Sequence, residues 1–382
     1  AVIVIRILPN FVTKESNDGW LGGELSEYHR FSNQGSTMQV FVAPHHAGHH
    51  SRQFIRHGRF AQSRDVPARA ERILEALRQD GHAIAEASPH GKAPIAAIHT
   101  PEYLAFLETA WTEWQAIEGA SEDVFPYVFP VRGMDHGYPT TVVGRAGYHM
   151  HDLWAPIGQH TWQVAIGSAN LAVAAAEHVL NGAPVAYALC RPSGHHAFAD
   201  MGGGNCFLNN AAIAAQHLRR GKARVALIDV DVHHGNGSQG IFYRRDDVLF
   251  VSLHRDPVDY HPYFAGHAHE RGEGDGRGFN LNLPLPAGAQ DDAYLAALET
   301  ACARIAAFAP DALVVSLGVD AHEDDPTAGL GLTFDGFRRI GARLAALGLP
   351  TVLVQEGGYN IDTIARCVAK ALAGFENRDT AA

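Results

Sequence analysis

Short apolar segments alternate with longer amphipathic segments along the chain from residue 38 onward. The apolar segments are rich in Val, Leu, Ile and Ala, and they span residues 38–44, 184–192, 224–232, 247–254, 312–320 and 350–358. Nearly continuous apolar runs of this length are typical of strands that are covered on both faces. The pattern therefore predicts a set of buried strands.

The amphipathic segments repeat apolar residues at helical spacing. One of them begins at Pro67 and ends at Gly81, which are helix start and stop signals. Similar segments span residues 101–117, 161–182 and 209–221. Because strands alternate with helices, we expect an α/β fold with a parallel sheet built from crossover units.

The pattern continues without a linker, repeat or low-complexity break, so we expect one domain over residues 38–382. Residues 1–37 match it poorly. We interpret them as a surface arm or as a segment foreign to the natural protein.

Composition narrows the possible functions. The formal net charge of −11 argues against nucleic acid, whose binders usually carry a basic patch, and fits a cationic small molecule better. No apolar run approaches the roughly 20 residues of a membrane span, and no secretory leader pattern is present. We expect a soluble cytoplasmic protein, and its scattered cysteines are then reduced thiols: Cys190, Cys206, Cys302 and Cys367.

Polar residues collect where the apolar segments end, in SGHH, DVHHGNG, LHRD, VDAHEDD and EGGY. In open parallel sheets, ligands bind at the carboxyl ends of the strands. Five segments that are far apart in the sequence are therefore predicted to meet at one crevice. We interpret the histidine-rich stretch 44–50 as a solvated loop outside it.

A metal site is the first chemistry that these ends predict. Asp231 and His233 lie two positions apart, so an extended chain presents both side chains on the same side. Asp320, at the end of another segment, is a third candidate ligand. One imidazole and two carboxylates leave an open position for water, as catalytic zinc sites do, and ferrous iron also accepts such ligands. Buried acids of this kind would be costly without a partner.

Two further motifs supply acid and base groups. His195 and His196 at a neighbouring segment end are expected to move a proton and to hold charge near the leaving group. Tyr359 is expected to donate to a developing oxyanion, and Gly357 and Gly358 before it allow a close approach of the loop. The alternatives are a surface histidine pair and a tyrosine that only packs in a turn.

In their order along the chain, RPSGHHA, DVDVHHGNGSQ, VSLGVD and EGGY resemble the motifs of the arginase/deacetylase superfamily. Within it they resemble histone deacetylase-like enzymes, specifically bacterial acetylpolyamine amidohydrolases. The resemblance runs from about residue 38 to the C-terminal helix. It implies an open arginase/deacetylase fold with an eight-stranded parallel sheet and helices on both faces.

The resemblance also implies roles for the site residues. Zinc would lie on Asp231, His233 and Asp320. His196 would be the general base, His195 its electrostatic partner and Tyr359 the oxyanion donor. Asp229 would orient His195, and Asn236 would orient His196, where many histone deacetylases have Asp instead.

Structural potassium is a further implication of the resemblance. Family members bind it, mostly through backbone carbonyls, at positions that correspond to Asp229, Asp231, His233, Ser252 and Leu253. A second monovalent site would be lined by Phe242, Arg245 and Val248.

The substrate channel departs from the family pattern. The sequence has GGNCF where the polyamine branch resembles GGYCF, so Asn205 replaces an aromatic wall beside Phe207. A second wall position holds His261 next to Tyr260. The stretches PEYLAFLETAWTEW and FPVRG look like the insertion that this branch uses to dimerise, so a homodimer through a segment near 111–133 is expected.

Together with the candidate metal site, the resemblance implies a zinc-dependent amidohydrolase that removes acetyl or related acyl groups from a small cationic amine, with acetylated polyamines as the expected substrates. Three alternatives stay open. The chain could deacetylate acetyl-lysine in proteins, or bind an acylated amine without hydrolysing it, although the second would be signalled by loss of the histidines or the tyrosine. A two-manganese ureohydrolase would need carboxylates at Gly235 and His322.

Overall fold

The computed structural model describes residues 38–378, so the predicted arm 1–37 lies outside the described residues. Eight strands form one parallel sheet. Their spatial order is β4 (Ala83–Glu86), β1 (Gln39–Val42), β5 (Val185–Ala188), β10 (Thr351–Gln355), β9 (Ala312–Leu317), β6 (Val225–Asp229), β7 (Val248–Arg255) and β8 (Asn280–Leu285). The predicted parallel sheet is confirmed.

Ten helices accompany the strands within the described part of the chain. They are α1 (Ala68–Gln79), α2 (Ala93–Ala96), α3 (Pro101–Gln115), α4 (Val142–His149), α5 (Thr161–Leu180), α6 (Asn210–Leu218), α7 (Asn236–Phe242), α8 (Asp291–Phe308), α9 (Phe334–Ala345) and α10 (Ile364–Glu376). The four helices predicted from apolar spacing correspond to α1, α3, α5 and α6. Side-chain caps support two of their starts, because Thr100 accepts from Tyr103 N and Asn209 accepts from Ala212 N.

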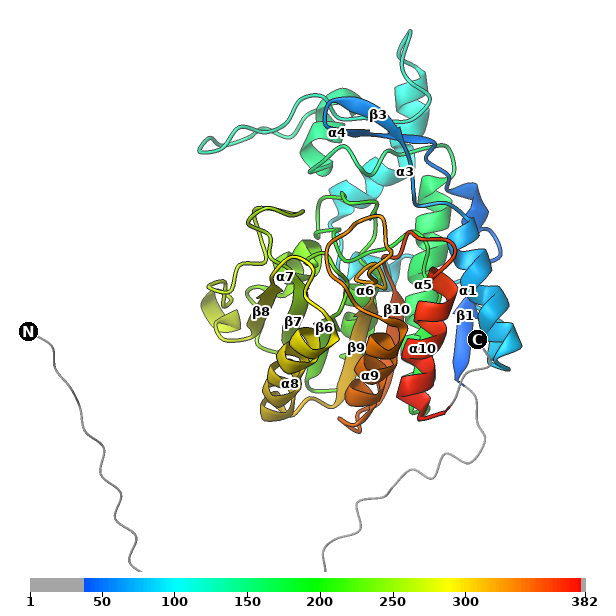
Figure 1. Ribbon diagram of the computed structural model, residues 1–382. Helices are drawn as coiled ribbons and strands as arrows, with labels where there is room; N and C mark the ends of the chain where they lie inside the picture. Colours follow the sequence, from blue (N-terminus) through cyan, green and yellow to red (C-terminus); the bar gives the residue numbers. More distant parts are fainter. Residues whose placement is uncertain (1–37, 379–382) are drawn as a thin grey trace, which may run out of the picture. The chain divides into compact units, whose positions relative to one another are not determined.

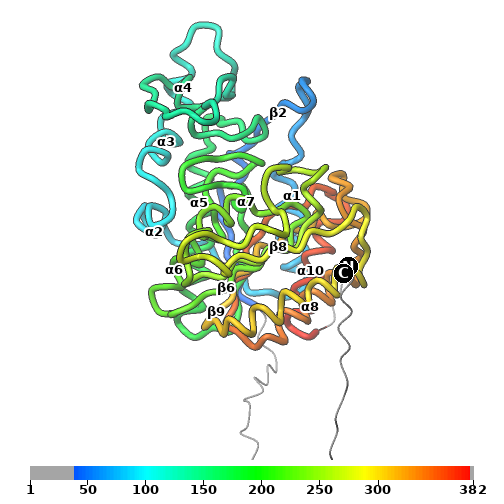
Figure 2. The backbone as a smooth tube through the Cα atoms, turned by 90° about the vertical axis from the view of Figure 1, so that its left-hand side faces the viewer, coloured from blue at the N-terminus to red at the C-terminus, as the bar shows by residue number. Residues whose placement is uncertain are grey.

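Helices cover both faces of the sheet, as Figure 1 shows. In the view turned by 90°, α5 and α6 lie on one side of the sheet and α8 and α10 on the other (Figure 2). Strand β9 explains the arrangement, since Val314 packs into the first layer while Leu313 and Val315 pack into the second. Both faces of this strand are therefore apolar, which is why its sequence reads as a continuous run.

The edge strands β4 and β8 were not predicted. Strand β4 is half exposed, and β8 carries the polar residues Asn280 and Asn282, so neither reads as a buried apolar run. An antiparallel hairpin of β2 (Gln53–Arg56) and β3 (Arg59–Gln62) was also missed. In Figure 1 this hairpin, α3 and α4 lie beyond the carboxyl ends of the sheet strands. No helix within residues 38–378 is long and apolar enough to cross a membrane.

Candidate metal and catalytic site

Two aspartates and a histidine meet where β6 and β9 end. His233 Nδ1 lies 3.1 Å from Asp231 Oδ1 and 3.2 Å from Asp320 Oδ2. All three residues are buried, and their ligand atoms lie within 4.8 Å of one another. The three ligands predicted from the sequence therefore meet because β6 and β9, whose ends carry them, are neighbours in the sheet.

Backbone groups hold the two carboxylates in place. Gly357 N donates to Asp231 Oδ2 at 2.9 Å, and Val232 N donates to Asp320 Oδ1 at 3.0 Å. A Cβ on Gly357 would overlap both carboxylates, and Gly358 has a φ of +130°. The loop after β10 can approach the acids this closely only because both positions are glycine.

The donor set fits a divalent cation. Burial and the neighbouring Asp231 carboxylate raise the pKa of Asp320 to about 7, because two buried negative charges repel each other. Oδ2 of Asp320 is buried and receives no well-aligned hydrogen bond, although His233 Nδ1 lies near it. A cation between these oxygens and the imidazole would reduce the repulsion between the two carboxylates and would give Asp320 Oδ2 a partner. Oxygen and nitrogen donors suit zinc or ferrous iron.

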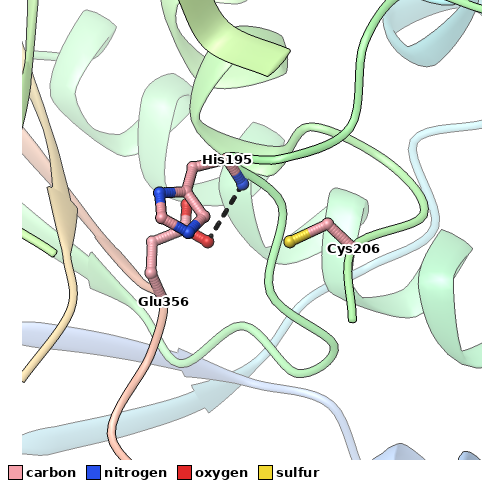
Figure 3. A group of neighbouring side chains, drawn as sticks. All are labelled: His195, Cys206 and Glu356. Atoms are coloured by element: carbon pink, nitrogen blue, oxygen red, sulfur yellow. Dashed lines mark hydrogen bonds between the residues drawn. The ribbon is translucent and has the colours of Figure 1, made fainter. Parts of the chain in front are cut away.

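A second group of potential ligands lies close by, made of His195, Cys206 and Glu356 (Figure 3). Its members have other uses. Glu356 Oε2 accepts from Gly194 N at 2.7 Å and from His195 N at 3.2 Å, so it ties the histidine loop to β10. Burial raises the pKa of the Cys206 thiol well above its ordinary value, which disfavours a thiolate. We interpret this group as support for the loop.

The two adjacent histidines differ in charge. His195 Nδ1 lies 2.9 Å from Asp229 Oδ2, and its Nε2 lies 3.9 Å from Asp231 Oδ2. Burial alone would lower the pKa of His195, but these two carboxylates outweigh it and raise the pKa to about 10. His195 is therefore an imidazolium near neutral pH.

Among the residues that the structure describes, those that affect the His196 ring are histidines and Asn236, and none is an acid. His196 Nδ1 lies 2.7 Å from Asn236 Oδ1, which leaves Nε2 as the acceptor of a neutral ring. Burial, together with the neighbouring imidazoles of His195, His261 and His233, lowers the pKa of His196 well below its usual range. A neutral base with a free Nε2 lines the cavity.

Tyr359 also lines this cavity, and helix α1 holds its loop. Arg69 donates from Nε to Gly358 O at 2.5 Å and from Nη2 to Glu356 O at 2.7 Å. The guanidinium carbon lies 4.7 Å from the centre of the Tyr359 ring. Burial raises the pKa of the Tyr359 hydroxyl well above its ordinary value, against the opposing effect of Arg69. The hydroxyl therefore stays a donor.

Arg69 belongs to a buried ionic network that sequence reasoning missed. Asp65 pairs with Arg69 at 2.6 Å and with Arg191 at 3.0 Å. Burial would raise the pKa of Asp65, but the two arginines outweigh it and lower the pKa to about 2. His49 lies 3.7 Å from the same carboxylate and is buried, so the stretch 44–50 is not wholly solvated.

The cavity has a volume of about 230 Å³. Asn205, Tyr260 and His261 line it, as expected for channel residues. Phe207 is not part of the lining: its ring is buried with its centre 5.1 Å from that of His49, because the chain turns inward after Asn205. Of the four residues predicted for the channel, Phe207 therefore lies outside the cavity lining.

An acid missed by sequence reasoning orders this wall. Asp152 accepts from Gly204 N at 2.8 Å and from Trp154 N at 2.8 Å. Its Oδ2 lies 3.6 Å from His261 Nε2. The His261 ring stacks on Trp154, with centres 4.9 Å apart. No periodic pattern marks Asp152, because it lies in an irregular loop before α5.

The positions proposed for potassium lie beside the metal group. Asp229 and Ser252 are register partners in β6 and β7, and Leu253 follows Ser252. At the other proposed site, the Arg245 guanidinium lies 5.1 Å from the Phe242 ring centre and pairs with Asp247, just before Val248. Both potassium sites stay predictions.

Two positions bear on a second metal. A Cβ on Gly235 would overlap the Asp229 carboxylate, so the backbone needs glycine there. His322 is buried against Phe334, with ring centres 4.5 Å apart. Neither position supplies the carboxylate of a two-metal site.

A profile of the histone deacetylase domain matches residues 63–375. The chain belongs to the histone deacetylase family. Acetylpolyamine amidohydrolase 1 of Pseudomonas aeruginosa is 47% identical to it over 336 residues, which cover 87% of this chain and 96% of that protein. The acetylpolyamine amidohydrolase of Burkholderia pseudomallei is 45% identical over 344 residues, or 88% and 98% of the two chains.

A solved structure is similar as well. The crystal structure of acetylpolyamine aminohydrolase from Burkholderia pseudomallei matches with a TM-score of 0.86 and 46% identity, covering 89% of this chain and 98% of that one. This histone deacetylase family member is thus a metal-dependent hydrolase of amide bonds, a deacetylase. The predicted family, fold and reaction class are confirmed. They are favoured over the alternatives of a ureohydrolase and of a binding protein that does not hydrolyse its ligand.

Proposed function

We propose that the chain hydrolyses the amide bond of small acetylated amines at the cavity that His196, His233 and Tyr359 line. One observation carries the proposal: His196 and Tyr359 line the same cavity as the ligand His233, and His195 Nε2 lies 3.9 Å from Oδ2 of the ligand Asp231. Base, acid and oxyanion donor are the parts that amide hydrolysis needs.

The metal would be held by Asp231, His233 and Asp320. When bound, it supplies Lewis acidity that polarises the amide carbonyl and makes water easier to deprotonate. His196 Nε2 takes the proton of the water as the oxygen of that water attacks the carbonyl carbon. The same proton then passes to the amine nitrogen as the C–N bond breaks, which leaves acetate and a free amine.

The neighbouring side chains hold charge during this reaction. Asp229 keeps His195 an imidazolium, and Asn236 orients His196 without adding charge. The Tyr359 hydroxyl donates to the carbonyl oxygen as negative charge develops on it. Arg69 is a positioning residue, because it holds the carbonyl groups on both sides of Gly357.

Acetylated polyamines are the substrates that we propose. The support is the printed name of relatives that are 45–47% identical over most of both chains. Turnover of the metal-loaded chain against acetylated polyamines, acetyl-lysine peptides and longer acyl amides tests this choice. Faster turnover of acetyl-lysine peptides would favour a protein deacetylase, and hydrolysis of no amide would refute the function.

Zinc is the metal that we propose, with ferrous iron as the alternative, and potassium is proposed as a structural ion. Three ligands, and glycine and histidine in place of carboxylates at Gly235 and His322, support one transition metal per chain. Elemental analysis of active protein should give about one such metal per chain. Two tightly held manganese ions, both needed for activity, would contradict this stoichiometry.

A homodimer through the segment near 111–133 is a further proposal. Trp111 donates to Glu122 O, and Trp114 donates to Ser121 Oγ. The two tryptophans therefore make contacts within their own chain. The support comes from the exposed apolar side chains that follow them between α3 and α4. They are Tyr127, Val128, Phe129, Val131 and Met134, with 45–69% of their surface exposed. Such a patch on one segment marks an interaction surface, and we assign it to a second copy of the chain.

Light scattering at micromolar concentration tests the dimer. We expect a dimer from the native chain and a monomer from Tyr127→Ser combined with Phe129→Ser. Val258→Ser is the matched control, since Val258 is 73% exposed outside this segment. A monomeric native chain would refute the dimer.

A cytoplasmic location is proposed from the four buried, unpaired cysteines, and cell fractionation tests it.

A further inference from the structure

Two arginines that the proposed mechanism does not use line the mouth of the active-site cavity. Arg56 is the last residue of β2, and Arg64 follows β3, so the hairpin carries both to the cavity wall. His196 and Tyr359 line the same cavity. Two positive charges therefore face the space that contains the reaction centre.

Neither guanidinium is neutralised. The guanidinium carbon of Arg56 lies 6.0 Å from the centre of the Trp154 ring, and Arg64 donates from Nη1 to Pro326 O at 2.8 Å. Both arginines are exposed, and within residues 38–378 neither forms an ion pair with a carboxylate. Each guanidinium has five N–H donors, so most of them stay available to a ligand.

One carboxylate lines the mouth, and it already has a partner. Asp259 Oδ1 accepts from Arg255 Nη2 at 2.6 Å. The Arg255 guanidinium also lies 5.4 Å from the centre of the Tyr260 ring, which holds it in place. The mouth therefore presents net positive charge to a bound molecule.

A series of rings connects the reaction centre with the mouth. The ring centres of His196 and His261 are 4.9 Å apart, and those of His261 and Trp154 are also 4.9 Å apart. Arg56 lies over Trp154. Phe54 packs edge-on against Trp154 at 5.8 Å. Flat walls of this kind suit a methylene chain, with one end at His196 and the other at Arg56.

We propose that Arg56 and Arg64 form a subsite for a carboxylate at the far end of the substrate. The chain then also deacetylates ω-acetamido acids, whose acetylated nitrogen and carboxylate are joined by methylenes. A guanidinium matches a carboxylate with two parallel N–H donors, whereas it repels a terminal ammonium. The inference rests on the proposed function and refines its substrates, because the two arginines favour a carboxylate end over the ammonium end of an acetylated polyamine.

Three acetamides with the same five-methylene chain test the subsite on the zinc-loaded full chain. One ends in a carboxylate, one in an ammonium and one in a methyl group. We expect kcat/KM of the carboxylate-ended acetamide to be about tenfold above that of the methyl-ended one, with the difference in KM. Equal values, or preference for the ammonium, would overturn the subsite.

Substitutions assign the preference to the arginines. Arg56→Gln and Arg64→Gln should each lower the ratio of the two kcat/KM values by several-fold, and the double variant should abolish the preference. Arg59→Gln is the matched control, because Arg59 lies exposed in the same hairpin and outside the cavity lining. If Arg59→Gln changes the ratio as much, or if all three acetamides lose turnover equally, the subsite is wrong.

Calorimetry with the metal-free chain distinguishes failure of the proposed function from failure of the carboxylate subsite. If no acetamide is hydrolysed, the proposed function fails. Binding of the carboxylate-ended acetamide to the native chain but not to the double arginine variant would then still support the subsite. If the other two acetamides are hydrolysed while the carboxylate-ended one is neither preferred nor bound, the subsite alone fails.

Discussion

His195 and His196 are adjacent in the sequence, but the fold favours the protonated form of His195 and the neutral form of His196. Two carboxylates raise the pKa of His195 to about 10, while burial and three neighbouring imidazoles lower the pKa of His196 against the opposing effect of its hydrogen bond to Asn236. The same residue type therefore performs two tasks, one electrostatic and one as a base. At this scale the environment, and not the residue type, sets the chemistry.

Removing one hydroxyl tests the role of Tyr359. Tyr359→Phe keeps the ring under Arg69 and deletes the donor to the developing oxyanion, so we expect kcat to fall by roughly 10²-fold or more. Metal content should be unchanged, and KM should change little. Steady-state kinetics and elemental analysis check both. Tyr243→Phe serves as the control, and near-normal turnover of Tyr359→Phe would mean that the tyrosine only packs in its turn.

At the scale of elements, the loop after β10 is held between the metal ligands and helix α1. Gly357 touches the two carboxylates from one side, and Arg69 grips the carbonyls of Glu356 and Gly358 from the other. The loop is therefore placed by a helix that begins almost 300 residues earlier. Two substitutions separate these contributions.

The first substitution is Gly357→Ala. Its Cβ would displace the carboxylates of Asp320 and Asp231, so we expect loss of bound metal together with loss of activity. Gly167→Ala is the control, because its Cβ would meet only Ala43, at an ordinary distance of 3.8 Å. Metal analysis of the two purified variants is the measurement. Full metal content in Gly357→Ala would contradict the close approach of this loop.

The second substitution is Arg69→Met. It removes one of the two arginines beside the buried Asp65 carboxylate, and we expect a loss of about 3 kcal/mol in the free energy of unfolding. Turnover should also fall, because the Tyr359 loop loses two donors. Arg72→Met on the exposed face of the same helix should do neither. Denaturant unfolding and kinetics check this, and equal stability of the two variants would exclude a structural role for Arg69.

At the scale of the whole molecule, the buried carboxylates of the metal-ligand group lower the stability of the metal-free chain, and a bound metal removes this penalty. Asp231 and Asp320 are completely buried like charges, so a cation that binds the folded chain stabilises it. We expect chelation to lower the melting temperature and added zinc to restore it. Thermal unfolding with and without chelator is the measurement. Asp320→Asn should respond far less, and an unchanged melting temperature of the native chain would contradict the buried site.

The same Asp320 carboxylate contributes to the pH dependence of the metal-free chain. The pKa of Asp320 is raised to about 7 in the folded chain, above the ordinary value of 3.8, so below pH 7 the folded chain binds a proton that the unfolded chain lacks. The contribution of Asp320 to the unfolding free energy should therefore fall as pH rises from about 4 through 7. Comparison of the native chain with Asp320→Asn across this range isolates that contribution from the buried histidines, whose lowered pKa values act in the opposite direction. Chelation should destabilise the chain more at pH 8 than at pH 6. A difference between the native chain and Asp320→Asn that does not change with pH would mean that Asp320 keeps an ordinary pKa.

Local patterns were enough to predict much of the molecule. Continuous apolar runs predicted the central strands, because a strand that is buried on both faces is apolar at every position. Apolar spacing with end signals predicted four helices, because a helix that is buried on one face repeats its apolar residues every three or four positions. The spacing of Asp231 and His233 likewise predicted that both side chains meet at one strand end. These properties depend on neighbours within a few residues.

Tertiary structure decided what depends on distant neighbours. The half-exposed edge strand β4 carries too weak a pattern to be predicted, and no signal links Arg69 to the loop that it holds. The inward turn of Phe207 and the arrival of Arg56 at the cavity mouth follow from how separate loops pack. The charge of His195 and the neutrality of His196 were likewise set only by the folded surroundings, because burial and Coulomb interactions act through space and not along the chain.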